Sequence, residues 1–157
     1  MTTRVLDTSA LMSGRPFDGE LLTTDEVLKE LRRLEAVTPE LESFMDLKVR
    51  VVSPSRESLS AMRTASEQTG DAHRLSPTDL GLLAVGSELH ATIVTDDYSI
   101  QNLAEVVGVP HETVLEGGIT QVVRWRYRCT GCGKFYDAWV EPCPVCGAKL
   151  RTTRARA

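Results

Sequence analysis

Aromatic residues are scarce in this sequence, at 5% of 157 positions, and long apolar runs are missing. No run approaches the ~20 residues that a membrane-spanning helix needs, and the N-terminus lacks the apolar core of a signal peptide. A glycine-rich phosphate loop of the Walker or dinucleotide type is also absent, which argues against those nucleotide-binding classes. We therefore expect a soluble, cytoplasmic protein with no membrane partner.

Acidic and basic residues are unevenly divided along the chain. Residues 1–119 contain 10 Lys or Arg and 20 Asp or Glu, whereas residues 120–157 contain 8 Lys or Arg and 2 Asp or Glu. The division indicates an acidic body followed by a separate basic module, and a basic module is a candidate for binding nucleic acid. The alternative is a solvated, arginine-rich terminus, because charge runs are common on protein surfaces.

Cysteine occurs only in the basic module, at Cys129, Cys132, Cys143 and Cys146. Two C-x-x-C pairs separated by ten residues are typical of a tetrahedral structural zinc site in an intracellular chain. Each pair is followed by a glycine, Gly133 or Gly147, which permits a tight turn with amides pointing at sulfur. A redox C-x-x-C motif is the competing interpretation, but the thioredoxin-like βαβ context is missing. Zinc would stabilise a module that is too small to bury a sufficient core.

Strand-like and helix-like segments alternate through the acidic body, which predicts an α/β fold around a mostly parallel sheet. The expected strands are residues 4–6, 48–53, 91–95 and 108–114, with Pro110 weakening the last. Expected helices open at Thr24-Asp25, Thr38-Pro39 and Ser76-Pro77 and cover residues 55–69 and 98–107. We expect a turn at residues 7–9, a loop at 14–19 and a further strand-like segment at 135–140 of the basic module.

Four acidic residues border apolar sequence in the body, namely Asp7, Glu30, Asp79 and Asp96. Asp7 and Asp96 end expected strands, and parallel sheets bind ligands at the carboxyl ends of their strands. Carboxylates at the rim of a core lose solvation and repel one another, a conflict that Mg²⁺ or Mn²⁺ resolves. Such an ion activates water to hydrolyse a phosphodiester. Taken singly, the aspartates could be helix caps and Glu30 an exposed helix charge.

A family resemblance rests on these same motifs. The segment Val5–Met12 resembles the opening strand of a PIN-domain nuclease, and residues 25–31, 76–84 and 93–104 resemble the family's other acidic motifs. Order and spacing match along roughly 1–114. A PIN domain followed by two C-x-x-C pairs is similar to the NIN-one-binding-protein family of ribosome-biogenesis endonucleases, in its compact archaeal form.

The resemblance implies an α/β fold with a PIN-like, mostly parallel sheet flanked by helices, plus a small C-terminal zinc ribbon. The expected divisions are a PIN nuclease domain at 1–116, a linker at 117–124 with a hinge at its start, a zinc ribbon at 125–151 and a basic tail at 152–157. The implied activity is a metal-dependent endoribonuclease that trims the 3′ end of small-subunit ribosomal RNA in a pre-small ribosomal subunit.

The resemblance also implies roles for individual side chains. Asp7, Glu30, Asp79 and Asp96 would hold Mg²⁺ or Mn²⁺, with Asp97, Thr8 and Ser9 assisting. Glu26 lies one helical turn before Glu30 and competes for the second position. The residues expected to contact RNA phosphates are Arg124, Arg126, Arg128, Lys134, Lys149 and Arg151. Most aromatic residues of the ribbon are expected to be structural, covering the zinc or sealing a domain contact.

Two other functions remain open on the sequence alone. One is a non-catalytic adaptor that binds RNA or the ribosome through its zinc ribbon, with the carboxylates serving as helix caps. The other is a toxin-like PIN ribonuclease that acts on other RNA. A toxin-like enzyme would have no need of the appended ribbon.

Overall fold

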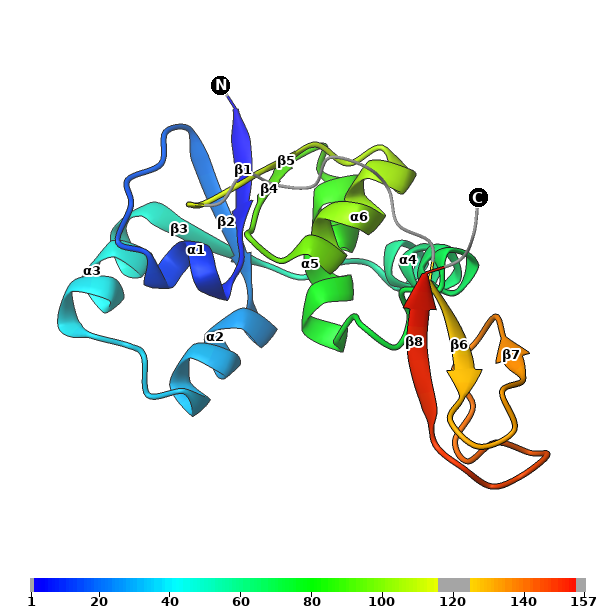
Figure 1. Cartoon of the computed structure of the whole chain (residues 1–157). Helices are drawn as coiled ribbons and strands as arrows, with labels where there is room; N and C mark the ends of the chain where they lie inside the picture. Colours follow the sequence, from blue (N-terminus) through cyan, green and yellow to red (C-terminus); the bar gives the residue numbers. More distant parts are fainter. Residues whose placement is uncertain (1, 116–124, 155–157) are drawn as a thin grey trace.

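The computed structural model describes residues 2–115 and 125–154 of the chain. Its first part forms a five-stranded, fully parallel sheet in the order β3-β2-β1-β4-β5 (Figure 1). The strands are β1 (Thr3–Leu6), β2 (Glu20–Thr24), β3 (Val49–Val52), β4 (Thr92–Val94) and β5 (His111–Glu112). Flanking helices cover the sheet and bury an apolar core. The α/β fold with a mostly parallel sheet is therefore confirmed.

In the part of the chain that the structure describes, six helices connect the strands. Each follows an Asp, Ser or Thr cap whose side chain accepts a hydrogen bond from a first-turn amide. They are α1 (Thr8–Met12), α2 (Asp25–Arg33), α3 (Pro39–Lys48), α4 (Arg56–Thr69), α5 (Pro77–Glu88) and α6 (Tyr98–Val107). Proline follows the cap in α3 and α5, as expected at positions where the proline nitrogen needs no partner.

The elements differ from the expected ones in three ways. Residues 8–12 form helix α1 rather than a turn, because the Asp7 side chain caps it. Strand β2 was not anticipated, since it runs directly into the cap of α2 at Thr24. The expected strands at 108–114 and 135–140 shorten to two residues each, His111–Glu112 and Phe135–Tyr136. Pro110 cannot donate to a strand ladder, which explains the first shortening.

Residues 125–154, called the ribbon below, form an antiparallel sheet in the order β7-β6-β8. Its strands are β6 (Trp125–Cys129), β7 (Phe135–Tyr136) and β8 (Leu150–Arg154). Tyr127, Cys129, Cys143 and Leu150 form its small buried core. The expected tail at 152–157 begins too early, because β8 continues to Arg154 and pairs it with Trp125. The expected linker, its hinge and Arg124 lie outside the described residues.

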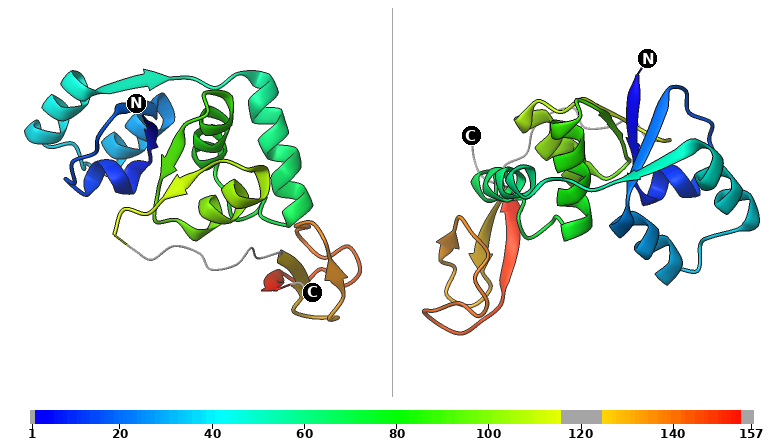
Figure 2. Two further views of the ribbon diagram at one scale, coloured as in Figure 1. Left: turned by 90° about the horizontal axis from the view of Figure 1, so that it is seen from above. Right: turned by 180° about the vertical axis from the view of Figure 1, so that it is seen from behind.

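The ribbon packs against the loop between α4 and α5 (Figure 2). The buried Tyr127 donates its hydroxyl hydrogen bond to the carbonyl of Gly70, which ends α4. In the left view of Figure 2 the ribbon lies at this end of α4, and in both views it lies on the other side of the body from α3. Within the described residues, no helix is long and apolar enough to span a membrane.

Candidate active site and zinc centre

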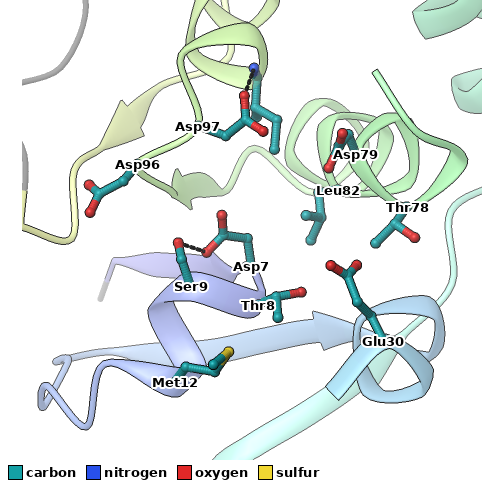
Figure 3. Close-up of a pocket in the computed structure, with 11 residues that line it drawn as sticks. Asp7, Thr8, Ser9, Met12, Glu30, Thr78, Asp79, Leu82, Asp96 and Asp97 are labelled. Atoms are coloured by element: carbon teal, nitrogen blue, oxygen red, sulfur yellow. Dashed lines mark hydrogen bonds between the residues drawn. The ribbon is translucent and has the colours of Figure 1, made fainter. Parts of the chain in front are cut away.

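The topology brings acidic residues from four segments to one edge of the sheet. Strands β1 and β4 are parallel neighbours, with Leu6 opposite Val94, so the residues that follow them emerge side by side. A cavity of about 390 Å³ opens at this edge (Figure 3). Its lining includes Asp7, Thr8, Ser9, Glu30, Asp79, Asp96 and Asp97. Every acidic residue expected at the site therefore borders a single cavity, which we call the acidic pocket.

Asp7 is the buried member of the acidic pocket, with 6% of its surface exposed. One carboxylate oxygen accepts hydrogen bonds from the Ala10 amide at 2.8 Å and the Ser9 hydroxyl at 2.7 Å. The other accepts from the hydroxyl of Thr95, a residue that sequence reasoning missed. Burial raises the pKa of Asp7, although these hydrogen bonds oppose the shift and the charge of Asp97 adds to it. The ionised carboxylate is thus held in place at an electrostatic cost.

Asp79 lies in the first turn of α5, where it completes a capping box. The Ser76 amide donates to its carboxylate at 3.0 Å, and the Asp79 amide donates to the Ser76 hydroxyl at 3.1 Å. Burial raises the pKa of Asp79, and the charges of Asp97 and Glu30 raise it further. The capping role and the pocket role therefore coexist in one side chain.

Asp96 and Asp97, which follow β4, both line the acidic pocket but have different partners. The Asp96 carboxylate accepts hydrogen bonds from the backbone amides of Val114, at 2.7 Å, and Leu115, at 3.0 Å. Figure 3 shows it turned away from the carboxylates of Asp7 and Asp97. Asp97 caps α6 through one oxygen, and its charge raises the pKa of both Asp7 and Asp79. Asp97, expected only to assist, thus interacts electrostatically with the other pocket acids, whereas backbone amides hold the Asp96 carboxylate.

Glu26 and Glu30 have different surroundings on α2. Glu30 is half-buried and lines the acidic pocket, where its charge raises the pKa of Asp79. Glu26 is exposed and pairs with Lys29 at 3.3 Å, outside the pocket. Of these two residues, Glu30 therefore lies beside the other pocket carboxylates.

The acidic pocket offers the donors that a hard divalent cation prefers. The five carboxylates of the acidic pocket and the hydroxyls of Thr8 and Ser9 offer only oxygen donors. Burial, the largest cause, and repulsion from neighbouring carboxylates together raise the pKa of Asp7 and Asp79. The carboxylate oxygens border one cavity but do not converge as closely as the cysteine sulfurs described next. The donor chemistry therefore fits Mg²⁺ or Mn²⁺.

The four cysteines form a compact cluster in the ribbon, with all sulfur atoms within 4.8 Å of one another. The Cys129–Cys146 and Cys132–Cys143 sulfur pairs are 3.2 Å and 3.9 Å apart. A tetrahedron of four ~2.3 Å zinc–sulfur bonds has edges of ~3.8 Å, so this arrangement is suited to a metal ion. The tyrosine hydroxyl of Tyr136, 3.1 Å from the Cys143 sulfur, lowers the pKa of that thiol to about 6.

The turns of the cluster behave as their sequence predicts. Gly133 and Gly147 have φ angles of 78° and 79°, in the region that favours glycine. Amides of Gly131 and Cys132 donate to the Cys129 sulfur at 3.3 Å and 3.4 Å. Thiolate ligands are commonly stabilised by such donors.

The basic side chains of the ribbon are not equivalent. Arg126 pairs with Asp137 at 3.1 Å. Arg128 and Arg151 lie opposite each other across β6 and β8, and both line a cavity of about 510 Å³ beside the first cysteine turn. Lys134 and Lys149 are exposed. Arg128 and Arg151 therefore present two positive charges to one cavity, whereas Arg126 is paired with Asp137.

Most aromatic residues of the ribbon are structural, as expected. Tyr127 is buried, and Trp139 stacks on His73 of the body with ring centres 3.8 Å apart. Trp125 lies beneath the guanidinium of Arg74 at 4.0 Å. The sequence did not predict that His73 and Arg74 contact the ribbon, because the pattern of residues 70–74 does not indicate a docking surface.

A parallel sheet that gathers carboxylates at the carboxyl ends of its strands, followed by a four-cysteine ribbon, defines the class of PIN-domain nucleases with an appended metal module. Residues 5–89 match the family described as PIN domain of ribonuclease. The chain is 38% identical over 150 residues to Endoribonuclease Nob1 of Pyrococcus abyssi, covering 94% of this chain and 91% of that protein.

Further relatives show the same relationship. Endoribonuclease Nob1 of Methanothermobacter thermautotrophicus is 32% identical over 160 residues, or 98% of this chain and 94% of that protein. Ribonuclease VapC1 of Thermoplasma acidophilum is 35% identical over 152 residues, or 94% and 76% of the two chains. The chain belongs to the Nob1 family of PIN-domain endoribonucleases, which confirms the family predicted from the sequence.

Proposed function

We propose that this endoribonuclease cleaves single-stranded precursor RNA at the 3′ end of small-subunit ribosomal RNA, in the cytoplasm and within the pre-small ribosomal subunit. Asp7, Glu30, Asp79 and Asp97 would hold Mg²⁺ or Mn²⁺, and the four cysteines would hold structural zinc. The observation that carries the proposal is the acidic pocket, where carboxylates from four segments of the chain meet at one sheet edge. Asp96 would have a structural role, because its carboxylate accepts hydrogen bonds from the amides of Val114 and Leu115.

The chain's own side chains would do the positioning. The chemistry that Mg²⁺ or Mn²⁺ supplies when bound is activation of water and neutralisation of charge on the phosphodiester. Asp7 is held by three hydrogen bonds, so its carboxylate is oriented before any ligand arrives. Thr95 joins two pocket acids, since its hydroxyl donates to Asp7 and accepts from the Asp97 amide at 3.0 Å. Thr8 and Ser9 would orient a phosphate oxygen or a water at the pocket rim.

The basic ribbon would hold the RNA. An acidic body repels a polyanion, and a positively charged partner module offsets that repulsion. The exposed side chains of Arg128, Lys134, Lys149 and Arg151 support this role, and Arg124 and Arg126 belong to the same proposal with Arg126 weakened by Asp137. Binding through phosphates would make the affinity depend strongly on salt.

Cleavage of a defined RNA tests the proposal. A 5′-labelled RNA spanning the mature 3′ end of small-subunit ribosomal RNA is incubated with zinc-loaded protein, with and without Mn²⁺. We expect cleavage at that end only with the cation, and a loss of at least about 100-fold for Asp7→Asn. RNA binding by the variant, measured by fluorescence anisotropy, should be unchanged.

Two outcomes would replace the proposal. Cleavage by neither form, with intact RNA binding, would support a non-catalytic adaptor that works through the ribbon. Equal cleavage of unrelated single-stranded RNA of the same length would support a toxin-like ribonuclease with other substrates. A scrambled RNA of identical composition is the matched control.

A further inference from the structure

The loop between α4 and α5, residues 70–76, lies between the ribbon and the acidic pocket. It begins at Gly70, the residue that ends α4, and leads into Ser76, the residue that caps α5. Its contacts on both sides suggest that it does more than connect two helices.

On the ribbon side, the loop provides a closely fitted docking surface. The Tyr127 hydroxyl donates to the Gly70 carbonyl. A Cβ atom at position 70 would lie 2.0 Å from the Trp125 carbonyl oxygen, so only glycine permits this approach. The rings of His73 and Trp139 stack with 6° between their planes, and the Arg74 guanidinium lies 4.0 Å from the Trp125 ring centre.

On the pocket side, the same loop adjoins the residues that hold the carboxylates of Asp97 and Asp79. Arg74 Nε donates to the Ser99 hydroxyl at 3.4 Å, and the Ser99 amide donates to the Asp97 carboxylate at 2.8 Å. Two residues after Arg74, Ser76 and Asp79 form the capping box of α5. Arg74 thus contacts the ribbon and the first turn of α6 with one guanidinium group.

A buried carboxylate fixes the loop in this position. Asp71 has no exposed surface, and its carboxylate accepts from Thr69 at 2.6 Å and from Asn102 of α6 at 2.9 Å. The Arg74 amide donates to the Asp71 carbonyl at 2.8 Å. Because the loop is tied to α6 in this way, a shift of Arg74 would be transmitted to the α6 N-terminus.

We propose that the docked ribbon positions the carboxylates of Asp79 and Asp97, with Arg74 as the positioning residue between them. The expected effect on metal binding rests on the proposed function, which assigns Asp79 and Asp97 to Mg²⁺ or Mn²⁺. The ribbon then has a second task besides holding RNA. Coupling of this kind is reciprocal, so occupation of the acidic pocket would also strengthen ribbon docking.

The first test requires no catalytic cation. Solvent exchange of backbone amides is measured by NMR in zinc-loaded, Mn²⁺-free protein. Arg74→Ala and Tyr127→Phe should each accelerate exchange of the Asp79, Ser99 and Ile100 amides about fivefold or more. Those amides donate to Ser76 or Asp97 in the intact caps. Unchanged exchange in both variants would overturn the inference.

The second test measures affinity for Mn²⁺ by isothermal titration calorimetry. We expect Arg74→Ala to bind Mn²⁺ about fivefold more weakly, with zinc content and Tm unchanged. Arg74→Lys should recover part of the loss, because it keeps a cation over Trp125. Arg63→Ala is the matched control, since Arg63 is an exposed arginine of α4 whose side chain makes no described contact.

The two proposals fail in different ways. Wild-type protein that binds no Mn²⁺ would contradict the proposed function, while amide exchange still decides whether the ribbon supports the caps. Wild-type protein that binds Mn²⁺ with the same affinity as Arg74→Ala would overturn the inference and leave the proposed function intact.

Discussion

Asp7 illustrates how a single residue can serve activity at the expense of stability. The residue is 6% exposed, and burial raises the pKa of its carboxyl. A carboxyl whose pKa is higher in the folded chain binds protons more readily when folded. The stabilisation that protonation provides is present at low pH and is lost as the pH rises from the unfolded pKa through the folded one. At neutral pH the ionised group is therefore destabilising unless a cation is bound.

Neutralising Asp7 should accordingly stabilise the metal-free protein. Asn retains the shape of the side chain and remains a good cap for α1. We expect Asp7→Asn to raise Tm at pH 7 by roughly 2–4 °C, the shift given by 1 kcal/mol in a chain of this size. The slope of Tm against pH above about 4 should also flatten. Calorimetry in chelated, zinc-loaded buffer measures both, and a clearly lower Tm for the variant would contradict this account.

Glu30 and Glu26 provide a matched pair on one helix. Glu30→Gln removes a pocket carboxylate, and cleavage should fall roughly 100-fold because its charge no longer helps to hold the cation. Glu26→Gln breaks only an exposed pair with Lys29, so cleavage should stay within about twofold of wild type. Initial rates at saturating Mn²⁺ decide the matter. Equal effects of the two substitutions would remove Glu30 from the site.

At the scale of elements, the helix caps and the acidic pocket are built from the same residues. Asp7 caps α1, Asp97 caps α6 and Asp79 stands in the capping box of α5. A cap position places a carboxylate against positive helix ends and beside the core, which is also where a pocket for a cation can form. Local sequence therefore cannot separate a capping acid from a catalytic one, because both need the same position.

Asp96 and Asp97 allow the two roles to be separated experimentally. Asn caps a helix about as well as Asp, so Asp97→Asn should change the free energy of unfolding by less than about 0.5 kcal/mol while cleavage falls roughly 100-fold. Asp96→Asn weakens charge-assisted bonds to Val114 and Leu115, which should cost about 1 kcal/mol and leave cleavage within about threefold. Urea unfolding and cleavage rates test both, and the reverse pattern would return Asp96 to the site.

The parts of the fold that the sequence predicts are those governed by local chemistry. Helix α6 has the expected bounds of 98–107, and Gly70 ends α4 as expected. Strand β2 was not predicted, because no turn separates it from α2. The direction of the Asp96 carboxylate depends on the chain at Val114, 18 residues away, and the ribbon contact depends on Tyr127, 57 residues from Gly70. Such long-range partners are set by tertiary packing.

At the scale of the whole molecule, the acidic and basic parts of the sequence form two modules that are in contact. The body carries the acidic pocket, and the ribbon exposes its cations on a sheet of its own. Arg128 and Arg151 face each other across two strands, and like charges in that arrangement are destabilising. A phosphate between them would relieve the repulsion. The acidic body would otherwise repel the RNA that the pocket must reach.

The salt dependence of RNA binding should report this pair. Each phosphate contact to a single strand contributes about 0.7 to the slope of log affinity against log salt. Replacing Arg128 and Arg151 together by Ala should therefore make the slope shallower by about 1.4. Arg126→Ala is the control, because that side chain is already paired with Asp137. The slope of this variant should change by less than the ~0.7 that one phosphate contact contributes. Anisotropy titrations without Mn²⁺, at equal zinc content, measure all three proteins. If the pair contacts two phosphates, RNA binding by the double variant must release fewer counterions than binding by the wild type. An unchanged slope would therefore show that Arg128 and Arg151 do not contact the RNA.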